Sequence, residues 1–358
     1  MKVRFSIIIP FYNTPKQFFF RMLDSIRNQT YSSYEIIVID DGSDSSDSSF
    51  LDDITDIRLF RQKNKGVSAA RNLGIKYSRG DYTVFVDADD VIDCRFLETA
   101  NTYLKEYDTE IIYGTIAYAE IRGEHLIKLT GKNCRAEDYD SITYSQKQNV
   151  KDVYYYANDK IDEVKRCLLD IQPRSDQYVI LGSPCGSVYK TELIKSIEFP
   201  ENIAICEDQV FNRKVLLSAK TCLVVPDLWY YYLQNQFSAM HKERKLYSLE
   251  KKTPYWDALR KLHEMESNNM IPFLNAVYLD LYCNSLKNIS SSEDKMMEKL
   301  RKVNVLYNHP LIKAALKENI KSGKKSLRVK CWLVKNHGSL VLLALYKIKN
   351  QMIRIQQE

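Results

Sequence analysis

The first ninety residues alternate short apolar runs with stretches in which apolar residues recur every three or four positions. The run over residues 5–9 is of the type found in strands buried on both faces of a parallel sheet. Further strands are predicted over residues 34–39, 57–60 and 82–86. Helical spacing follows in two places, at Phe19, Met22, Leu23 and Ile26 and again over residues 67–77. Strands that alternate with helices predict an α/β fold, with a doubly wound, mostly parallel sheet flanked by helices.

Beyond residue 90 the pattern is less regular. We predict strands over 111–118 and 221–225, and helices over 152–169 and 208–219. From residue 246 onward the spacing is helical throughout. We therefore expect a catalytic and nucleotide-binding domain over residues 1–240 and a helical carboxyl-terminal region over residues 241–358.

Composition narrows the class of protein. A hydrophobic content of 45% is enough to bury a core, which excludes global disorder. The eight cysteines are scattered singly without a Cys-x-x-Cys pair, so neither a zinc site nor a disulfide framework is expected. Reduced thiols, and the lack of an apolar run long enough for a signal-peptide core or a membrane span, predict a cytoplasmic protein.

The positive charge is concentrated near the carboxyl end. Residues 321–354 hold nine Lys or Arg and no Asp or Glu, which leaves the rest of the chain at about −3 of the net +6. One interpretation is a tail that lies on an anionic membrane at the inner face of the cell membrane. The other is a solvated basic helix that caps the fold. A nucleic-acid partner is not expected, because the body of the chain is not basic.

Acidic residues follow two of the predicted strands. One strand runs into Asp40-Asp41-Gly42-Ser43 and another into Asp87-Ala88-Asp89-Asp90, while the first ends in Pro10-Phe11-Tyr12-Asn13. In an open parallel sheet such carboxyl ends share one edge, where ligands bind. No glycine-rich dinucleotide or Walker loop follows any strand, so a bound diphosphate would need a cation. Asp87 and Asp89 offer the hard oxygen ligands that Mg²⁺ or Mn²⁺ prefers.

Residues 64–74 read Asn-Lys-Gly-Val-Ser-Ala-Ala-Arg-Asn-Leu-Gly. A helix that begins there would present its amino terminus and Arg71 to a nucleotide. Its small residues would at the same time allow close packing on the sheet, so both interpretations hold together.

Four segments in this order resemble the family 2 glycosyltransferases. They are Ile-Ile-Ile-Pro-Phe-Tyr-Asn (7–13), Ile-Asp-Asp-Gly-Ser (39–43), the 64–74 segment and Asp-Ala-Asp-Asp (87–90). The resemblance is strong over residues 3–100, looser over 180–240 and absent beyond. It implies a GT-A fold and an inverting transfer from a nucleotide-diphospho sugar.

The resemblance also implies residue roles. Pro10, Tyr12 and Asp41 would line the nucleoside, with Asn64 and Arg71 as further nucleotide contacts. Asp87 would approach the ribose or the metal, and Asp89 would be the metal ligand. The pair Glu207-Asp208 resembles the family's acidic pair, whose aspartate is the usual base, although an acidic first turn of a helix is also common on its own. Asp208 would then be the base and Glu207 its catalytic neighbour.

Residues 229–241 occupy the place where relatives often carry Tyr-Arg-x-x-Ser. Gln234 and Gln236 stand there instead, which argues against a phosphate clamp. His241 is more simply a structural histidine than a ligand of metal or diphosphate. The aromatic run is interpreted as core and acceptor wall, and residues 183–189 as part of the acceptor pocket.

Together these features predict a metal-dependent hexosyltransferase. The resemblance implies a UDP-hexose or UDP-N-acetylhexosamine as donor, and the expected acceptor is a hydroxyl of a surface glycan or a lipid-linked acceptor. Two alternatives remain: a nucleotidyltransferase, which would need a basic triphosphate loop, and a non-catalytic partner that the basic tail recruits to a membrane complex.

Overall fold

A computed structural model describes two compact units of the chain. The first comprises Met1–Leu168 and Pro173–Leu246, and the second Leu169–Gln172 and Tyr247–Glu358. In the first unit the described residues are 3–122, 125–130, 135–137, 154–157, 183–203 and 206–233. In the second they are 294–310 and isolated positions between 254 and 313. The predicted basic tail and His241 lie outside the described residues.

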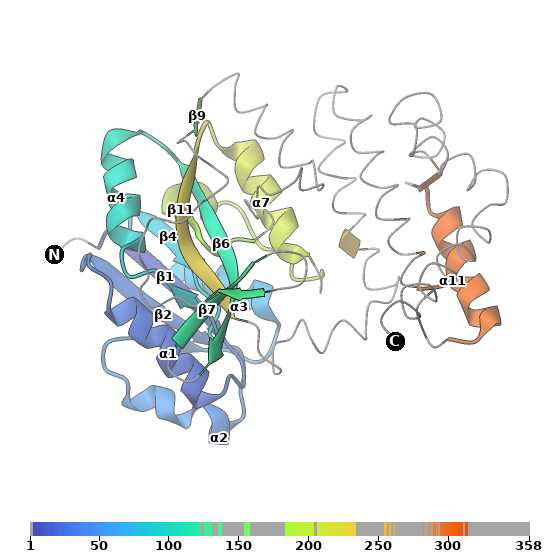
Figure 1. Cartoon of the computed structure of the whole chain (residues 1–358), viewed down its shortest axis with the longest axis horizontal. Coiled ribbons are helices and arrows are strands. Elements are labelled where there is room, and N and C mark those ends of the chain that lie inside the picture. Colours follow the sequence, from blue (N-terminus) through green and yellow to red (C-terminus); the bar gives the residue numbers. More distant parts are fainter. Residues whose placement is uncertain are drawn as a thin grey trace. The chain divides into compact units, whose positions relative to one another are not determined.

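The amino-terminal half of the sheet is parallel, as the apolar runs predict. Its strands are β1 (Phe5–Phe11), β2 (Tyr34–Asp40), β3 (Arg58–Arg61) and β4 (Tyr82–Phe85), in the order β3-β2-β1-β4. β1 pairs in parallel with both β2 and β4 (Figure 1). Short connections between them include α2 (Ser45–Ser48) and the 3₁₀ helix η1 (Ser49–Asp53).

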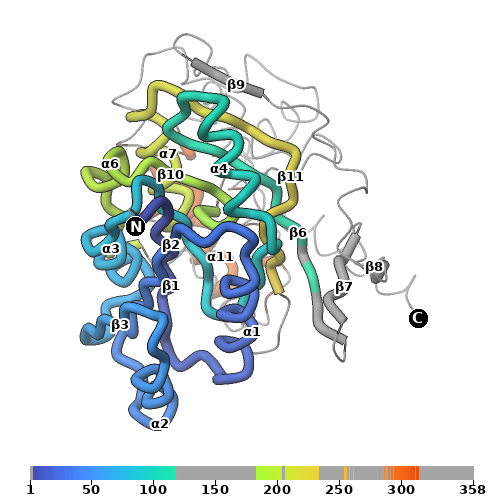
Figure 2. Tube along the Cα trace, turned by 90° about the vertical axis from the view of Figure 1, so that its left-hand side faces the viewer, coloured from blue at the N-terminus to red at the C-terminus, as the bar shows by residue number. Residues whose placement is uncertain are grey.

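Helices cover both faces of these strands. α1 (Lys16–Arg27) and α3 (Val67–Tyr77) lie on opposite sides of β1 and β2 (Figure 2). Ala70 of α3 packs on Ile37 and Ile39 of β2. A Cβ added at Gly74 would lie 2.3 Å from a methyl carbon of Ile8, so this helix approaches the sheet more closely than any side chain would allow.

The second half of the sheet is mixed. β10 (Ser187–Lys190) runs antiparallel to β4 and to β6 (Ile111–Arg122), and β6 pairs in parallel with β11 (Thr221–Leu233). β5 (Val91–Ile92) is antiparallel to β11 at the edge. The remaining elements are α4 (Phe96–Glu106), β7 (His125–Thr130), β8 (Arg135–Glu137), β9 (Tyr154–Ala157), α6 (Thr191–Ile194) and α7 (Glu207–Ser218).

Two predictions for this half need correction. The strand predicted over 221–225 continues to Leu233, because register shifts between Val224 and Leu228 carry the chain past Pro226 without ending its pairing with β6. The helix predicted over 152–169 is wrong at residues 154–157, which pair with β11 as β9. Three successive tyrosines there suit a strand better than a helix.

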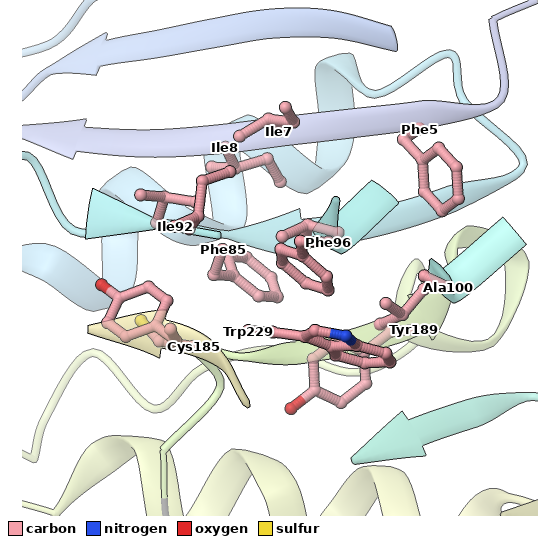
Figure 3. Packing of buried hydrophobic residues seen from close by; sticks show 14 of the residues in the cluster. Phe5, Ile7, Ile8, Phe85, Ile92, Phe96, Ala100, Cys185, Tyr189 and Trp229 are labelled. Carbon is pink, nitrogen blue, oxygen red and sulfur yellow. The ribbon is translucent and has the colours of Figure 1, made fainter. Parts of the chain in front are cut away.

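The main core cluster packs the sheet against α1 and α4 and also against α7. Phe96 of α4 stacks on Trp229 of β11 with ring centroids 4.7 Å apart, and both side chains are fully buried (Figure 3). Cys185, Tyr189 and Phe85 belong to the same cluster. The aromatic run of β11 is therefore part of the core, as predicted. It packs in the same cluster as Phe85 of β4.

In the second unit the structure describes the helix α11 (Met296–Asn308), whose Val303 and Leu306 are buried. Among the described residues of the whole chain, no helix is long and apolar enough to cross a membrane.

Candidate active site

The carboxyl ends of β1, β2 and β4 share one edge of the sheet, because the three strands are parallel neighbours. This confirms the convergence that the sequence predicts. At the end of β1, Pro10 is half-buried and pairs with Ile39, and the Tyr12 side chain is 54% exposed. Tyr12 thus presents an aromatic ring to solvent at the edge where the acidic residues gather.

Asp41 holds the loop that precedes α3. Its carboxylate accepts hydrogen bonds from the backbone N–H groups of Lys65 (2.9 Å) and Gly66 (2.8 Å) and from Gln62 Nε2 (2.7 Å). The adjacent Gly42 has φ +74°, and a Cβ there would lie 2.6 Å from the backbone nitrogen of Asn64. The chain beside Asp41 therefore passes close to the backbone of exposed Asn64, and only a glycine at position 42 allows this approach.

Arg71 links the acidic strand end to α7. Its guanidinium donates to Asp87 Oδ1 at 2.9 Å and to Glu207 Oε1 at 3.3 Å, and the residue is only 5% exposed. The same group lies over the ring of Phe199, 5.3 Å from its centroid. The structure thus joins three of the predicted residues, which are up to 136 positions apart in sequence, through one buried cation.

Tyr230 of β11 holds the turn after β4 through two hydrogen bonds. The Asp87 backbone N–H donates to the Tyr230 hydroxyl (3.1 Å), which itself donates to Asp90 Oδ2 (2.6 Å). Asp90 Oδ1 accepts the Leu233 N–H at 2.8 Å. Burial, together with the charges of Asp89 and Asp87, raises the pKa of Asp90 well above its usual range. Its two hydrogen bonds give Asp90 a structural role, because they join the turn to β11. The half-buried Asp89 lies between Asp87 and Asp90 in the turn.

Glu207 and Asp208 begin α7. The helix starts after Cys206, which has the left-handed φ of 66°. Burial raises the pKa of Asp208 to about 7, with the Glu207 charge adding to the rise and the Arg71 charge opposing it. Burial also raises the pKa of Glu207, against the opposing charge of Arg71. Asp208 therefore combines a backbone hydrogen bond from Gln209 with a proton affinity suited to acid–base chemistry near neutral pH.

The residues at this edge fit a divalent cation held jointly with a diphosphate. Among the described residues, no three His, Cys, Asp or Glu side chains form a cluster that would enclose a metal alone. Mg²⁺ at phosphate sites takes one or two carboxylates and completes its shell with phosphate oxygens and water. Asp87, with a side chain 32% exposed, and half-buried Asp89 supply such a pair.

The sequence gives Asp90 no role of its own within the acidic run 87–90, and it indicates no site role for Asn72 or Phe199. Tyr230 is predicted as core and acceptor wall, and no pattern in the sequence shows that its hydroxyl reaches Asp90. Asn72 stands beside Arg71 in the 64–74 segment. A polar residue in a helix that packs this closely on the sheet indicates a hydrogen-bonding role. Gln234 and Gln236 lie outside the described residues, so the argument about a phosphate clamp stays a prediction.

Comparison with known proteins agrees with this architecture. Residues 6–156 match the family described as glycosyl transferase family 2. The chain is 27% identical over 253 residues to glycosyltransferase GlyA of Streptococcus pneumoniae, covering 69% of this chain and 33% of that protein. It is 30% identical over 241 residues to the poly(ribitol-phosphate) beta-glucosyltransferase of Bacillus spizizenii, covering 64% of this chain and 32% of that protein. The chain thus spans about a third of the length of either relative.

Among solved structures, the crystal structure of Staphylococcus aureus TarS 1–349 in complex with UDP-GlcNAc is similar in fold. It matches with a TM-score of 0.64 at 18% identity, over 98% of this chain and 92% of that one. The match confirms the predicted GT-A fold. The family match and the curated relatives make the chain similar to family 2 glycosyltransferases, with the family match covering residues 6–156.

Proposed function

We propose that the chain is an inverting, metal-dependent glycosyltransferase that moves a sugar from a UDP-sugar to a hydroxyl of a surface glycan or a lipid-linked acceptor. One observation carries the proposal. Buried Arg71 joins Asp87, at the predicted diphosphate edge, to Glu207, and the neighbouring Asp208 has a pKa of about 7. A leaving-group site and a base are thus built into one connected unit.

In the proposed reaction Asp208 accepts the proton of the acceptor hydroxyl. The hydroxyl oxygen attacks the anomeric carbon while the bond from that carbon to the diphosphate oxygen breaks, and both bonding electrons leave with the UDP. A single displacement inverts the configuration and needs no enzyme nucleophile. A base with a pKa near the working pH is about half ionised there and still binds a proton well, which is the compromise that favours general base catalysis.

The donor would bind at the ends of β1, β2 and β4. Tyr12 and Pro10 would line the nucleoside, with Asp41 and Asn64 beside it and Arg71 near the nucleotide. Asp87 and Asp89 would hold Mn²⁺ or Mg²⁺, which offsets the charge that grows on a departing diphosphate. Arg71 spends two of its donors on carboxylates, so its support for the nucleotide would act partly through Asp87.

Two relatives support the proposed class of donor. The Bacillus protein is described as a poly(ribitol-phosphate) beta-glucosyltransferase, and full-length Staphylococcus aureus TarS as a poly(ribitol-phosphate) beta-N-acetylglucosaminyltransferase. Both descriptions support a UDP-hexose or UDP-N-acetylhexosamine as donor and a surface polymer as acceptor for this chain.

Donor hydrolysis tests the proposal. The protein is incubated with a panel of UDP-sugars and Mn²⁺, and released UDP is measured with and without a chelator. We expect release with one donor class and its loss on chelation, restored by added Mn²⁺. No release with any nucleotide sugar would favour the non-catalytic partner, and release unaffected by the chelator would refute metal dependence.

Location and membrane contact remain predictions, because residues 321–354 lie outside the described residues. If the basic tail binds an anionic surface, the full chain sediments with phosphatidylserine vesicles at low salt and is released at high salt. Undiminished binding after removal of residues 320–358 would contradict that role.

A further inference from the structure

Asn72 joins α3 to the segment that precedes α7. Its Oδ1 accepts the backbone N–H of Phe199 at 2.8 Å, and its Nδ2 donates to the Phe199 carbonyl oxygen at 3.0 Å. Nδ2 also lies 3.3 Å from Glu201 Oε1. One side-chain amide therefore satisfies both backbone groups of Phe199, as a neighbouring strand would.

Phe199, the residue that Asn72 holds, contacts several elements of the site. The buried Phe199 ring stacks on Phe211 of α7, with centroids 3.7 Å apart and planes at 8°. It meets Phe85 of β4 edge-on at 5.4 Å. The Arg71 guanidinium lies over the ring at 5.3 Å. Phe199 thus touches the strand that leads to Asp87, the helix that carries Asp208, and the cation that joins them.

We propose that Asn72 is a positioning residue for the transfer reaction, because it fixes Phe199 and, through Phe211, the first turns of α7. Phe211 follows Asp208 by three positions, a spacing that places both on one side of a helix. A displacement of Phe199 would therefore be passed to the base. The inference rests on the proposed function and adds to it a residue that contacts neither donor nor acceptor.

A misplaced base affects turnover more than donor binding. The donor edge has supports besides Phe199: β4 pairs with both β1 and β10, and Asp41 holds its loop through three hydrogen bonds. Displacements of about 1 Å near a reacting group can lower rates on the order of 100-fold. Loss of the Asn72 amide should therefore lower kcat and leave the KM for the donor nearly unchanged.

The test compares Asn72→Leu with Gln29→Leu. Gln29 is a matched control, since its amide also bridges backbone groups: Nε2 donates to the carbonyls of Ser25 and Asp93, and Oε1 accepts the Leu97 N–H. Both variants should lower the Tm. For Asn72→Leu we expect kcat per folded molecule to fall about 10- to 100-fold, with the donor KM and the UDP affinity within about twofold of wild type.

Asn72→Asp keeps the acceptor for the Phe199 N–H but turns an oxygen toward the Phe199 carbonyl and Glu201, so kcat should fall in this variant as well. A kcat no lower than that of Gln29→Leu, or a donor KM that rises as kcat falls, overturns the inference. Hydrogen exchange separates this outcome from failure of the proposed function, since it needs no turnover. Amides of residues 207–212 should exchange faster in Asn72→Leu than in Gln29→Leu, and unchanged exchange there refutes the positioning role even if the wild type releases no UDP.

Discussion

Asp41 and Asp208 each follow another acidic residue, yet their surroundings differ. Asp41 is buried and accepts three hydrogen bonds from N–H groups of residues 62–66. Asp208 is half-buried and accepts the Gln209 N–H, and the charge of the neighbouring Glu207 helps to raise the pKa of Asp208 to about 7. The two carboxylates therefore differ in what surrounds them. Fixed N–H donors stabilise Asp41, whereas Asp208 has lost much of its hydration and lies beside a like charge.

Hydrogen bonding separates a structural from a reactive carboxylate at this site. Both oxygens of Asp41 accept from fixed N–H groups, and both oxygens of Asp90 accept from Tyr230 and Leu233. A carboxylate that is desolvated next to a like charge binds a proton more readily. We infer that Asp41 shapes the donor loop and that Asp208 does the proton transfer, and substitutions at each position test that division.

The largest effect is expected for Asp208→Asn. An amide cannot accept the acceptor's proton, and general base catalysis contributes on the order of 10²- to 10⁴-fold. Transfer should fall by about that factor while UDP binding, measured by calorimetry, stays within about twofold. Near-normal turnover in this variant would remove Asp208 as the base and leave its raised pKa a consequence of burial alone.

Arg71→Met should have the next largest effect. Removing the cation leaves Asp87 and Glu207 without their shared partner, and breaking a buried ion pair costs about 3–5 kcal/mol. Arg27→Met is the control, because the Arg27–Asp56 pair is exposed at 38% and 45% and such pairs contribute about 1 kcal/mol or less. Urea unfolding measures both. Equal losses of unfolding free energy would show that the Arg71 network is no stronger than a surface pair.

The fold was largely predictable because the amino-terminal strands are buried on both faces. Continuous apolar runs located β1, β2 and β4 closely, and the helical spacing of residues 67–77 coincides with α3. β11 was predicted too short, since Pro226 breaks the local pattern while pairing with β6 continues beyond it. The local pattern of residues does not show this long-range pairing of strands.

The sequence predicted which residues belong to the site but not how they contact one another. The motif segments indicated Arg71, Asp87 and Glu207, but nothing in them shows that one guanidinium bonds both carboxylates. The Tyr230 hydroxyl on Asp90 and the Asn72 amide on Phe199 depend on segments 140 and 127 positions apart. Such contacts arise from packing of the mixed half of the sheet, where the sequence pattern was weakest.

Asp41→Asn tests the structural side of the comparison. The amide replaces one acceptor oxygen with a donor that faces the N–H groups of Gln62–Gly66, and an unmet buried hydrogen bond costs about 1–3 kcal/mol. We expect that loss in unfolding free energy, with the donor KM raised about tenfold and kcat little changed. Gln62→Leu removes one donor and keeps the carboxylate, so its effect should be smaller. A selective loss of kcat in Asp41→Asn would instead place Asp41 in the chemical step.

The smallest effect, and the most specific, is expected in the pH dependence of Glu207→Gln. If Asp208 must be ionised to act as base, kcat falls as the pH drops below its pKa of about 7. The Glu207 charge raises that pKa and the Arg71 charge lowers it, and the substitution removes the first while leaving the second. The acid limb of the kcat profile should therefore move to lower pH in Glu207→Gln. Glu201→Gln, an exposed carboxylate at the Asn72 contact, is the control and should leave the limb in place. A limb that moves to higher pH, or stays fixed, would mean that the group titrating in kcat is not Asp208.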